Sequence, residues 1–123
     1  MKHNTVLIVD DERRYADMLA RRLQLRGLIC TVCYDGQSAI DINTHESFAM
    51  IILDLRLPDL YGTEVLARIK QCRPEAQVVI LTGHGTDKDR DRCMQSGAHA
   101  FLNKPVDIDH LVKIMSRISG NTP

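Results

Sequence analysis

Short apolar runs and longer amphipathic stretches alternate along the whole chain. The central run, MIIL at residues 50–53, is apolar at every position, which is typical of a strand buried on both faces of a sheet. Similar apolar runs elsewhere predict four further strands. The five predicted strands cover residues 5–9, 28–33, 50–53, 77–81 and 98–102.

Between these runs, apolar residues recur every three or four positions, which predicts helices. Gly27 and Gly97 follow two of the stretches as stop signals, and Thr86 is a candidate N-cap. The last stretch has a full apolar stripe, formed by Ile108, Leu111, Val112, Met115 and Ile118. The predicted helices lie between residues 12 and 27 and over 37–45, 62–72, 86–96 and 107–118.

Strands and helices therefore alternate in five β-α units, which we interpret as a single domain over residues 1–123. Such alternation is typical of an α/β fold, in which helices cover both faces of a parallel sheet. Right-handed crossovers restrict the topology to a few doubly wound strand orders.

The composition excludes several classes of protein. Lys and Arg number 16, as do Asp and Glu, so no basic surface for nucleic acid or anionic lipid is expected. The longest apolar runs have about five residues, whereas a membrane span needs about 20. The first apolar run meets acidic residues at once, as a strand does and a signal peptide does not, so we expect a cytoplasmic protein without membrane contact.

Cys30 and Cys33 have the CxxC spacing of zinc and redox sites. They fall within a predicted strand, where residues three apart point to opposite faces, and no second such pair accompanies them. We therefore expect free thiols rather than a metal or redox site.

Polar side chains follow four of the predicted strands. Asp10 and Asp11 follow the first, Asp54 the third, Thr82 the fourth and Lys104 the fifth. The carboxyl ends of parallel strands share one edge of the sheet, so these side chains should converge. Two carboxylates about 4 Å apart repel by roughly 4 kcal/mol at an effective dielectric near 20, so the acids need a proton or a cation. Oxygen ligands favour Mg²⁺.

Each of these residues alone has an ordinary explanation, such as a helix cap, a strand end or a solvated lysine. Together, a divalent cation, the Lys104 ammonium and the Thr82 hydroxyl around one carboxylate would form a receptor for a phosphoryl group. Asp54 would then be the nucleophile that attacks phosphorus in line.

Four motifs resemble those of the receiver domain of two-component response regulators. They are LIVDDE at 7–12, LDLRLPDLYG at 53–62, LTGHG at 81–85 and SGAHAFLNKP at 96–105, and the resemblance runs from Val6 to Ile118. It implies a flavodoxin-like, chemotaxis-receiver-like fold with strand order 2-1-3-4-5, which is the known order of this fold class.

The resemblance implies that Asp54 accepts a phosphoryl group from a phosphohistidine, on a sensor histidine kinase or a phosphotransfer protein. Thr82 and Lys104 would contact the phosphoryl oxygens, and the Lys104-Pro105 bond would be cis. The domain would be a phosphoacceptor rather than an enzyme, with at most self-catalysed phosphorylation and dephosphorylation.

Mg²⁺ is the cofactor that the resemblance implies. Asp11 would bind it directly and Asp10 mainly through water, with Asp54 and the backbone carbonyl of Arg56 as further ligands. Arg56 and His84 flank the predicted site, where either could tune the phosphoryl lifetime.

Phe101 matches the switch aromatic of the family, which would turn inward as Thr82 moves toward the phosphate. The surface formed by residues 86–96, 98–102 and 107–118 would then change and control an output domain, a transcriptional one for example, or a downstream protein. A phosphorylation-dependent homodimer is also open. The first two turns of the helix over 86–96 are unusually polar (DKDRDR), which fits either a solvated face or a helix that orders on partner binding.

Two functions of other classes compete with this interpretation. A Mg²⁺-dependent phosphatase of the haloacid dehalogenase class also uses an aspartyl nucleophile, but it needs a second Asp two residues later, where this chain has Arg56. A flavin-binding module of the same architecture would need a phosphate loop after the first strand, where Asp10, Asp11 and Glu12 would repel phosphate. A receiver that signals without phosphate and a fragment of a longer regulator are open alternatives.

Overall fold

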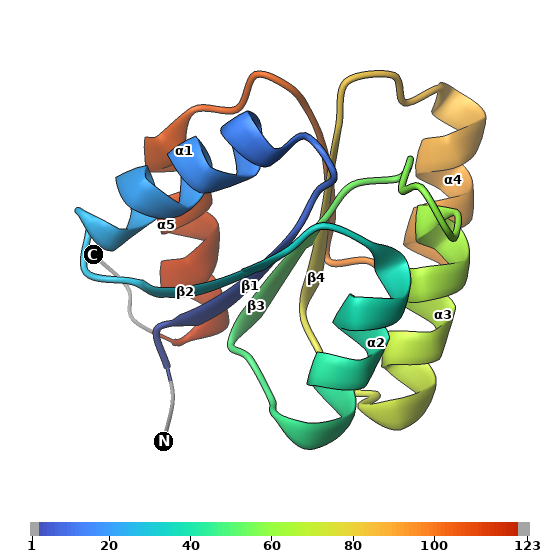
Figure 1. The fold of residues 1–123 in the computed structure, drawn as a ribbon, viewed down its shortest axis with the longest axis horizontal. Coiled ribbons are helices and arrows are strands. Elements are labelled where there is room, and N and C mark those ends of the chain that lie inside the picture. The colour runs from blue at the N-terminus through green and yellow to red at the C-terminus, as the bar shows by residue number, and fades with distance from the viewer. Residues whose placement is uncertain (1–2, 121–123) are drawn as a thin grey trace.

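The computed structural model describes residues 3–120, which form one parallel sheet flanked by helices (Figure 1). The strand order is β2-β1-β3-β4-β5, so the predicted flavodoxin-like order is confirmed. Its strands are β1 (Thr5–Val9), β2 (Ile29–Cys33), β3 (Met50–Leu53), β4 (Val78–Thr82) and β5 (Ala100–Asn103).

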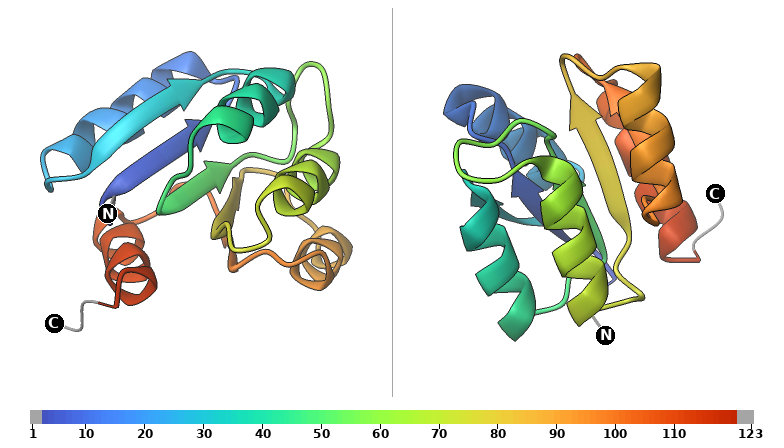
Figure 2. Two further views of the ribbon diagram at one scale, coloured as in Figure 1. Left: turned by 90° about the horizontal axis from the view of Figure 1, so that it is seen from below. Right: turned by 90° about the vertical axis from the view of Figure 1, so that its right-hand side faces the viewer.

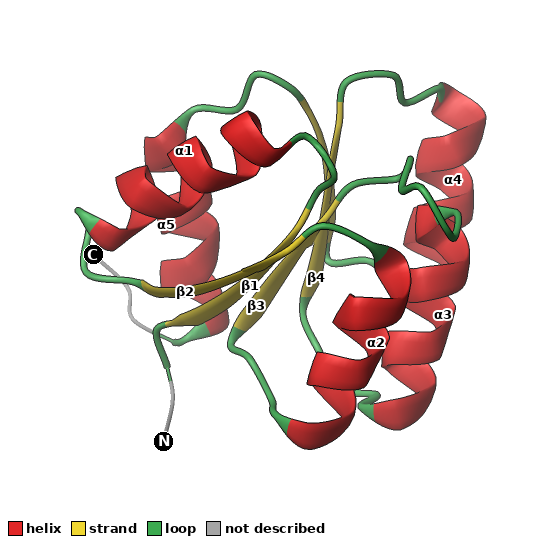
Figure 3. Cartoon of the chain, in the orientation of Figure 1, coloured by secondary structure: helices red, strands yellow, loops and turns green. Residues whose placement is uncertain are grey.

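A helix follows each strand of the described chain. The helices are α1 (Arg13–Gln24), α2 (Gly36–His45), α3 (Gly62–Cys72), α4 (Asp87–Gln95) and α5 (Ile108–Ile118). Figure 3 shows that the loops leaving the carboxyl ends of the strands gather on one side of the sheet. That side is where the predicted site should lie.

Alternation along the buried strands produces two hydrophobic cores. In β1, Leu7 and Val9 point to the core under α2 and α3, while Val6 and Ile8 point to the core under α1 and α5. Figure 2 shows these two helical layers on opposite faces of the sheet. Both faces of the central strands are therefore dry, which explains why the runs are apolar at every position.

Predicted and observed element boundaries differ by one or two residues. β4 extends to Thr82, because Thr82 pairs in register with Asn103 of β5. β5 begins at Ala100 rather than at residue 98, because the amide of Ala98 donates to Cys93 O in the turn that ends α4. Gly97 supplies the positive φ of 98° in that turn, as its position in the sequence predicted.

Carboxylates and hydroxyls begin the helices. Asp35 accepts a hydrogen bond from Ser38 N at the start of α2. Thr86 caps α4 as predicted, and it forms a capping box with Asp89. Asp107 is the N-cap of α5 rather than its first residue.

α4 is the most weakly packed helix of the described chain: Cys93 is its one buried residue. Its polar sequence is thus a solvated face in this structure. Cys30 and Cys33 belong to opposite cores, and all four cysteines are free, as expected. Among the described residues, no helix is long and apolar enough to span a bilayer.

Candidate functional site

The parallel ladder brings the predicted site residues to one edge, because it continues one residue past three of the strands. The amide of Asp10 donates to Cys33 O over 3.2 Å, that of Asp54 to Val9 O over 3.0 Å, and that of Lys104 to Thr82 O over 2.9 Å. The first residue after β1, β3 and β5 is therefore still held in sheet register.

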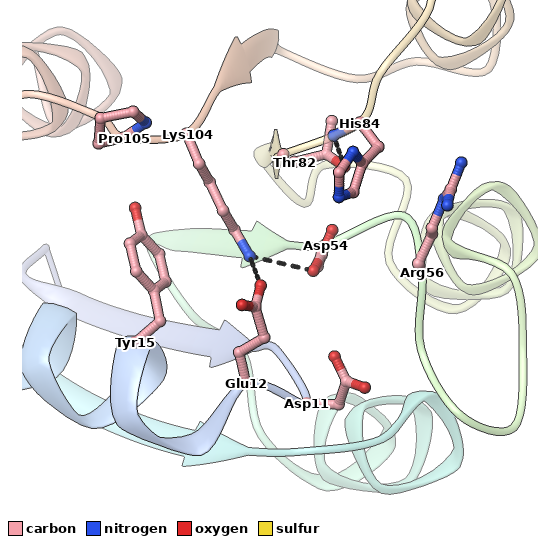
Figure 4. A pocket seen from close by; sticks show the side chains of 10 residues that line it. Asp11, Glu12, Tyr15, Asp54, Arg56, Thr82, His84, Lys104 and Pro105 are labelled. Carbon is pink, nitrogen blue, oxygen red and sulfur yellow. Dashed lines mark hydrogen bonds and ion pairs between the residues drawn. The ribbon is translucent and has the colours of Figure 1, made fainter.

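Lys104 is the centre of the site (Figure 4). Its Nζ lies 2.7 Å from Asp10 Oδ2, 2.6 Å from Glu12 Oε1 and 3.2 Å from Asp54 Oδ2. Asp10 and Asp54 are buried, and the Lys104 side chain is 10% exposed. The ring of Tyr15 lies on another side of the ammonium, 4.7 Å from Nζ to the ring centre.

Charge and burial act against each other at this ammonium. Burial lowers the pKa of Lys104, but its hydrogen bonds with Asp10 and Glu12 and the charge of Asp54 outweigh burial, so the pKa lies above its ordinary value. Burial raises the pKa of Asp10, and the hydrogen bond from Lys104 opposes it. The hydrogen bond with Lys104 lowers the pKa of Glu12. Lys104 thus stays charged at neutral pH among an excess of acids.

Three carboxylates are close enough to share a cation: oxygens of Asp10, Glu12 and Asp54 lie within 4.8 Å of one another. An all-oxygen donor set suits Mg²⁺, which commonly takes one or two carboxylates and keeps several waters. The residues therefore fit the predicted metal. Glu12, rather than Asp11, completes this cluster; Asp11 is exposed and lines the same cavity.

Sequence reasoning missed Glu12, because it counted this residue only as part of the acidic run before a helix. The structure makes it the N-cap residue of α1, and its amide donates to Asp10 Oδ1 over 2.9 Å. That bond orients the turn after β1, and the Glu12 side chain then reaches Lys104. The acidic run DDE at residues 10–12 was the only sequence feature that could have indicated a role for Glu12 in the site.

A cavity of about 550 Å³ opens over the central carboxylate. Arg56 and His84, the two predicted flanking residues, both line it. Figure 4 shows the His84 ring beside Thr82 and the Arg56 side chain on the far side of Asp54 from Lys104. The Lys104-Pro105 bond is cis, as predicted.

Thr82 and Phe101 meet through Gly85. Thr82 is 1% exposed, and Phe101 is half-buried against the core under α2 and α3. A Cβ added to Gly85 would lie 2.5 Å from Phe101 Cζ and 2.8 Å from Thr82 Cγ2. The glycine leaves the space in which the Phe101 ring packs, and sequence reasoning did not single it out.

The comparison with known families decides the identity. Residues 6–116 match the family described as the response regulator receiver domain. The chain belongs to this family. The predicted family and fold are confirmed.

Curated relatives are longer than this chain. It is 33% identical over 117 residues to the DNA-binding transcriptional regulator NtrC of Klebsiella pneumoniae, covering 95% of this chain and 25% of that protein. It is 30% identical to the uncharacterized transcriptional regulatory protein YkoG of Bacillus subtilis, covering 91% of this chain and 49% of the relative. The chain thus spans half or less of these two relatives.

Solved receiver domains share the fold closely. One, a response regulator protein from Burkholderia pseudomallei with a phosphorylated aspartic acid, a calcium ion and citrate, has a TM-score of 0.87 and 25% identity, covering 95% of this chain and 69% of that one. Another, the receiver domain of the sensor histidine kinase PA1611 from Pseudomonas aeruginosa with magnesium in its active-site cleft, has a TM-score of 0.86 and 26% identity, covering 95% of this chain and 98% of that one.

Proposed function

We propose that this receiver domain accepts a phosphoryl group on Asp54 and holds it with Mg²⁺, Thr82 and Lys104. The observation that carries the proposal is the contact of one ammonium with Asp54 and two further carboxylates at the edge of the cavity. Related proteins support it, since one solved receiver carries a phosphorylated aspartate and another a magnesium ion.

The reaction is a phosphoryl transfer. An oxygen of the Asp54 carboxylate attacks phosphorus, and the bond from phosphorus to the imidazole nitrogen of the donor phosphohistidine breaks. The leaving imidazole takes a proton from solvent. Asp10, Asp11 or Glu12, together with Asp54 and the Arg56 carbonyl, would hold Mg²⁺, which would supply positive charge to neutralise the phosphoryl oxygens.

Lys104 would supply a second positive charge to the phosphoryl group. To do so it must give up one of the ion pairs that it makes in this structure. Its Nζ must leave Glu12 or Asp10 to reach a phosphoryl oxygen. Thr82 Oγ1, which accepts a hydrogen bond from His84 N over 3.4 Å, is available to donate to another phosphoryl oxygen. The differential contacts of Lys104 and Thr82 with phosphate would bias the surface of α4, β5 and α5.

The partners follow from this chemistry. The phosphoryl donor would be a cytoplasmic histidine kinase or phosphotransfer protein. The element that responds to phosphorylation would be an output domain or a downstream protein. Both curated relatives named above are transcriptional regulators, which supports a transcriptional output in the full protein.

Incubation with acetyl phosphate and Mg²⁺, followed by intact mass, tests the function. The wild-type protein should gain one phosphoryl group, and Asp54→Ala should gain none. Asp41→Ala removes an exposed carboxylate of α2 that does not line the cavity, so it should be phosphorylated like wild type. Undiminished labelling of Asp54→Ala would refute the assignment.

A further inference from the structure

Asp59 connects the loop after β3 to the start of α2. Its Oδ1 accepts a hydrogen bond from Gly36 N and its Oδ2 one from Gln37 N, each over 2.8 Å. These partners precede Asp59 by 23 and 22 residues, so the contact is tertiary rather than local. The hydrogen bond from the Gly36 amide lowers the pKa of Asp59.

The beginning of α2 already has a cap of its own. Asp35 accepts hydrogen bonds from Ser38 N over 2.7 Å and from Ser38 Oγ over 2.9 Å. Two carboxylates therefore hold the first three amides of α2, one from the helix's own N-cap and one from the distant loop. A local cap such as Asp35 is the usual way to satisfy the first amides of a helix. The additional contact from Asp59 therefore also ties the loop after β3 to the start of α2.

This loop carries the candidate phosphorylation site. It leaves β3 at Asp54 and returns to α3 at Gly62, whose amide donates to Leu55 O over 2.6 Å. Arg56, whose carbonyl is a predicted metal ligand, pairs with Tyr61 in an isolated bridge. Backbone contacts thus close the loop where it leaves β3 and where it enters α3. Between these ends, Asp59 ties the loop to the start of α2.

The packing at Gly36 shows that the loop and α2 are in close contact. A Cβ added to Gly36 would lie 2.8 Å from Val65 Cγ2, 3.1 Å from Leu60 Cβ and 3.3 Å from Asp59 Oδ1. The helix start leaves no room for a side chain at this point, so the carboxylate of Asp59 reaches the amides directly.

We propose that Asp59 is a positioning residue of the phosphorylation site, because its bidentate contact with α2 holds the loop that presents Asp54 and the Arg56 carbonyl. The inference rests on the proposed function, in which that carbonyl and that carboxylate bind Mg²⁺. Residues that orient metal ligands from outside the coordination sphere commonly contribute about 10- to 100-fold to metal affinity.

The test compares Asp59→Ala with Asp35→Ala, since both variants remove a carboxylate from the start of α2 but only one removes it from the loop. The measurements are amide hydrogen exchange of residues 55–61 without metal, and the Mg²⁺ dissociation constant from NMR titration. Asp59→Ala should speed loop exchange and raise the Mg²⁺ dissociation constant about tenfold. Asp35→Ala should speed hydrogen exchange in α2. It should leave the hydrogen exchange of the loop and the Mg²⁺ dissociation constant near those of wild type.

Asp59→Asn keeps one acceptor oxygen and should fall between wild type and Asp59→Ala, which provides a milder variant if the alanine protein folds poorly. A Mg²⁺ dissociation constant within twofold of wild type in both Asp59 variants would overturn the proposal, as would an equal effect of Asp35→Ala. Failure of Asp54 to accept phosphate would refute the proposed function instead, since neither measurement uses phosphorylation.

Discussion

Lys104 Nζ lies 3.2 Å from Asp54 Oδ2, although 50 residues separate them in the chain. Asp54 directly follows β3 and Lys104 directly follows β5, and these two strands are not neighbours, because β4 lies between them. The lysine side chain spans this separation, and Lys104, Thr82 and Asp54 line one cavity. A phosphoryl group on Asp54, as proposed, would therefore lie within reach of residues at the ends of both β4 and β5.

Thr82→Ala should leave Asp54 able to accept phosphate while weakening the response of the distal surface. The variant keeps the Asp54 carboxylate and Lys104, but it loses the hydroxyl that would bind the phosphoryl group. NMR shift changes in α4, β5 and α5 on adding acetyl phosphate and Mg²⁺ measure the response. Shift changes equal to those of wild type in the phosphorylated variant would show that coupling takes another route.

Gly85→Ala should displace the Phe101 ring, because the added Cβ would lie 2.5 Å from Phe101 Cζ. We expect a loss of stability of about 1–3 kcal/mol, as is usual for overpacking. Gly83→Ala is the matched control, since the nearest atom to its Cβ would be Lys104 Cδ at 4.0 Å. The chain has two Phe residues, so ring NMR signals report Phe101, with Phe48 as an internal reference. Unchanged Phe101 signals in Gly85→Ala would refute this packing.

Asn43→Leu should stabilise the protein. Asn43 is 1% exposed on the inner side of α2, and its side-chain nitrogen and oxygen have no hydrogen-bond partner among the described residues. A buried amide without hydrogen-bond partners destabilises the folded state by about 1–3 kcal/mol, and leucine has a similar heavy-atom shape. We therefore expect the free energy of unfolding, measured with urea, to rise by about 1 kcal/mol or more. Asn43→Ala serves as the comparison, because it removes the amide but leaves a cavity. A less stable leucine variant would mean that the amide is satisfied.

The capping box of α4 should make stability depend on pH. The hydrogen bond from Thr86 N lowers the folded-state pKa of Asp89 below its ordinary value of 3.8. The stabilisation is therefore complete above pH 3.8 and is lost as the pH falls through the lower, folded-state value.

We expect Asp89→Ala to reduce the free energy of unfolding by about 0.5–1 kcal/mol at pH 7, and the difference from wild type to shrink below pH 3.8. Urea unfolding at a series of pH values measures this. Asp87→Ala, which removes an acid from the same first turn, controls for charge alone. A difference that stays constant down to pH 2.5 would contradict the assigned bond.

The sequence was sufficient for the fold and for the main site residues for one reason. Apolar runs show where strands end, and in a parallel sheet the next residue lies at the common edge. Asp10, Asp54 and Lys104 could be predicted this way, since each follows its strand directly and continues its ladder. Their roles in phosphoryl transfer and metal binding stay predictions.

Other residues were out of reach of pattern reasoning, each for a physical reason. Glu12 reaches Lys104 only through the path of its side chain at the start of α1. Asp59 finds partners 22 and 23 residues away through a loop whose course no periodicity encodes. Gly85 matters for the volume that it leaves empty, and Asn43 occupies an inward position that a helical pattern reserves for an apolar residue.

The position of Lys104 directly after the last strand has a consequence for biosynthesis. The ribosome delivers the chain from its N-terminus, so β1 and β3 emerge with their acids well before β5 brings the ammonium. A nascent chain that lacks β5 therefore carries Asp10, Glu12 and Asp54 without the ammonium that pairs with them in the folded structure. If Asp54 accepts phosphate as proposed, a ribosome-bound chain that still lacks Lys104 should be a poor acceptor.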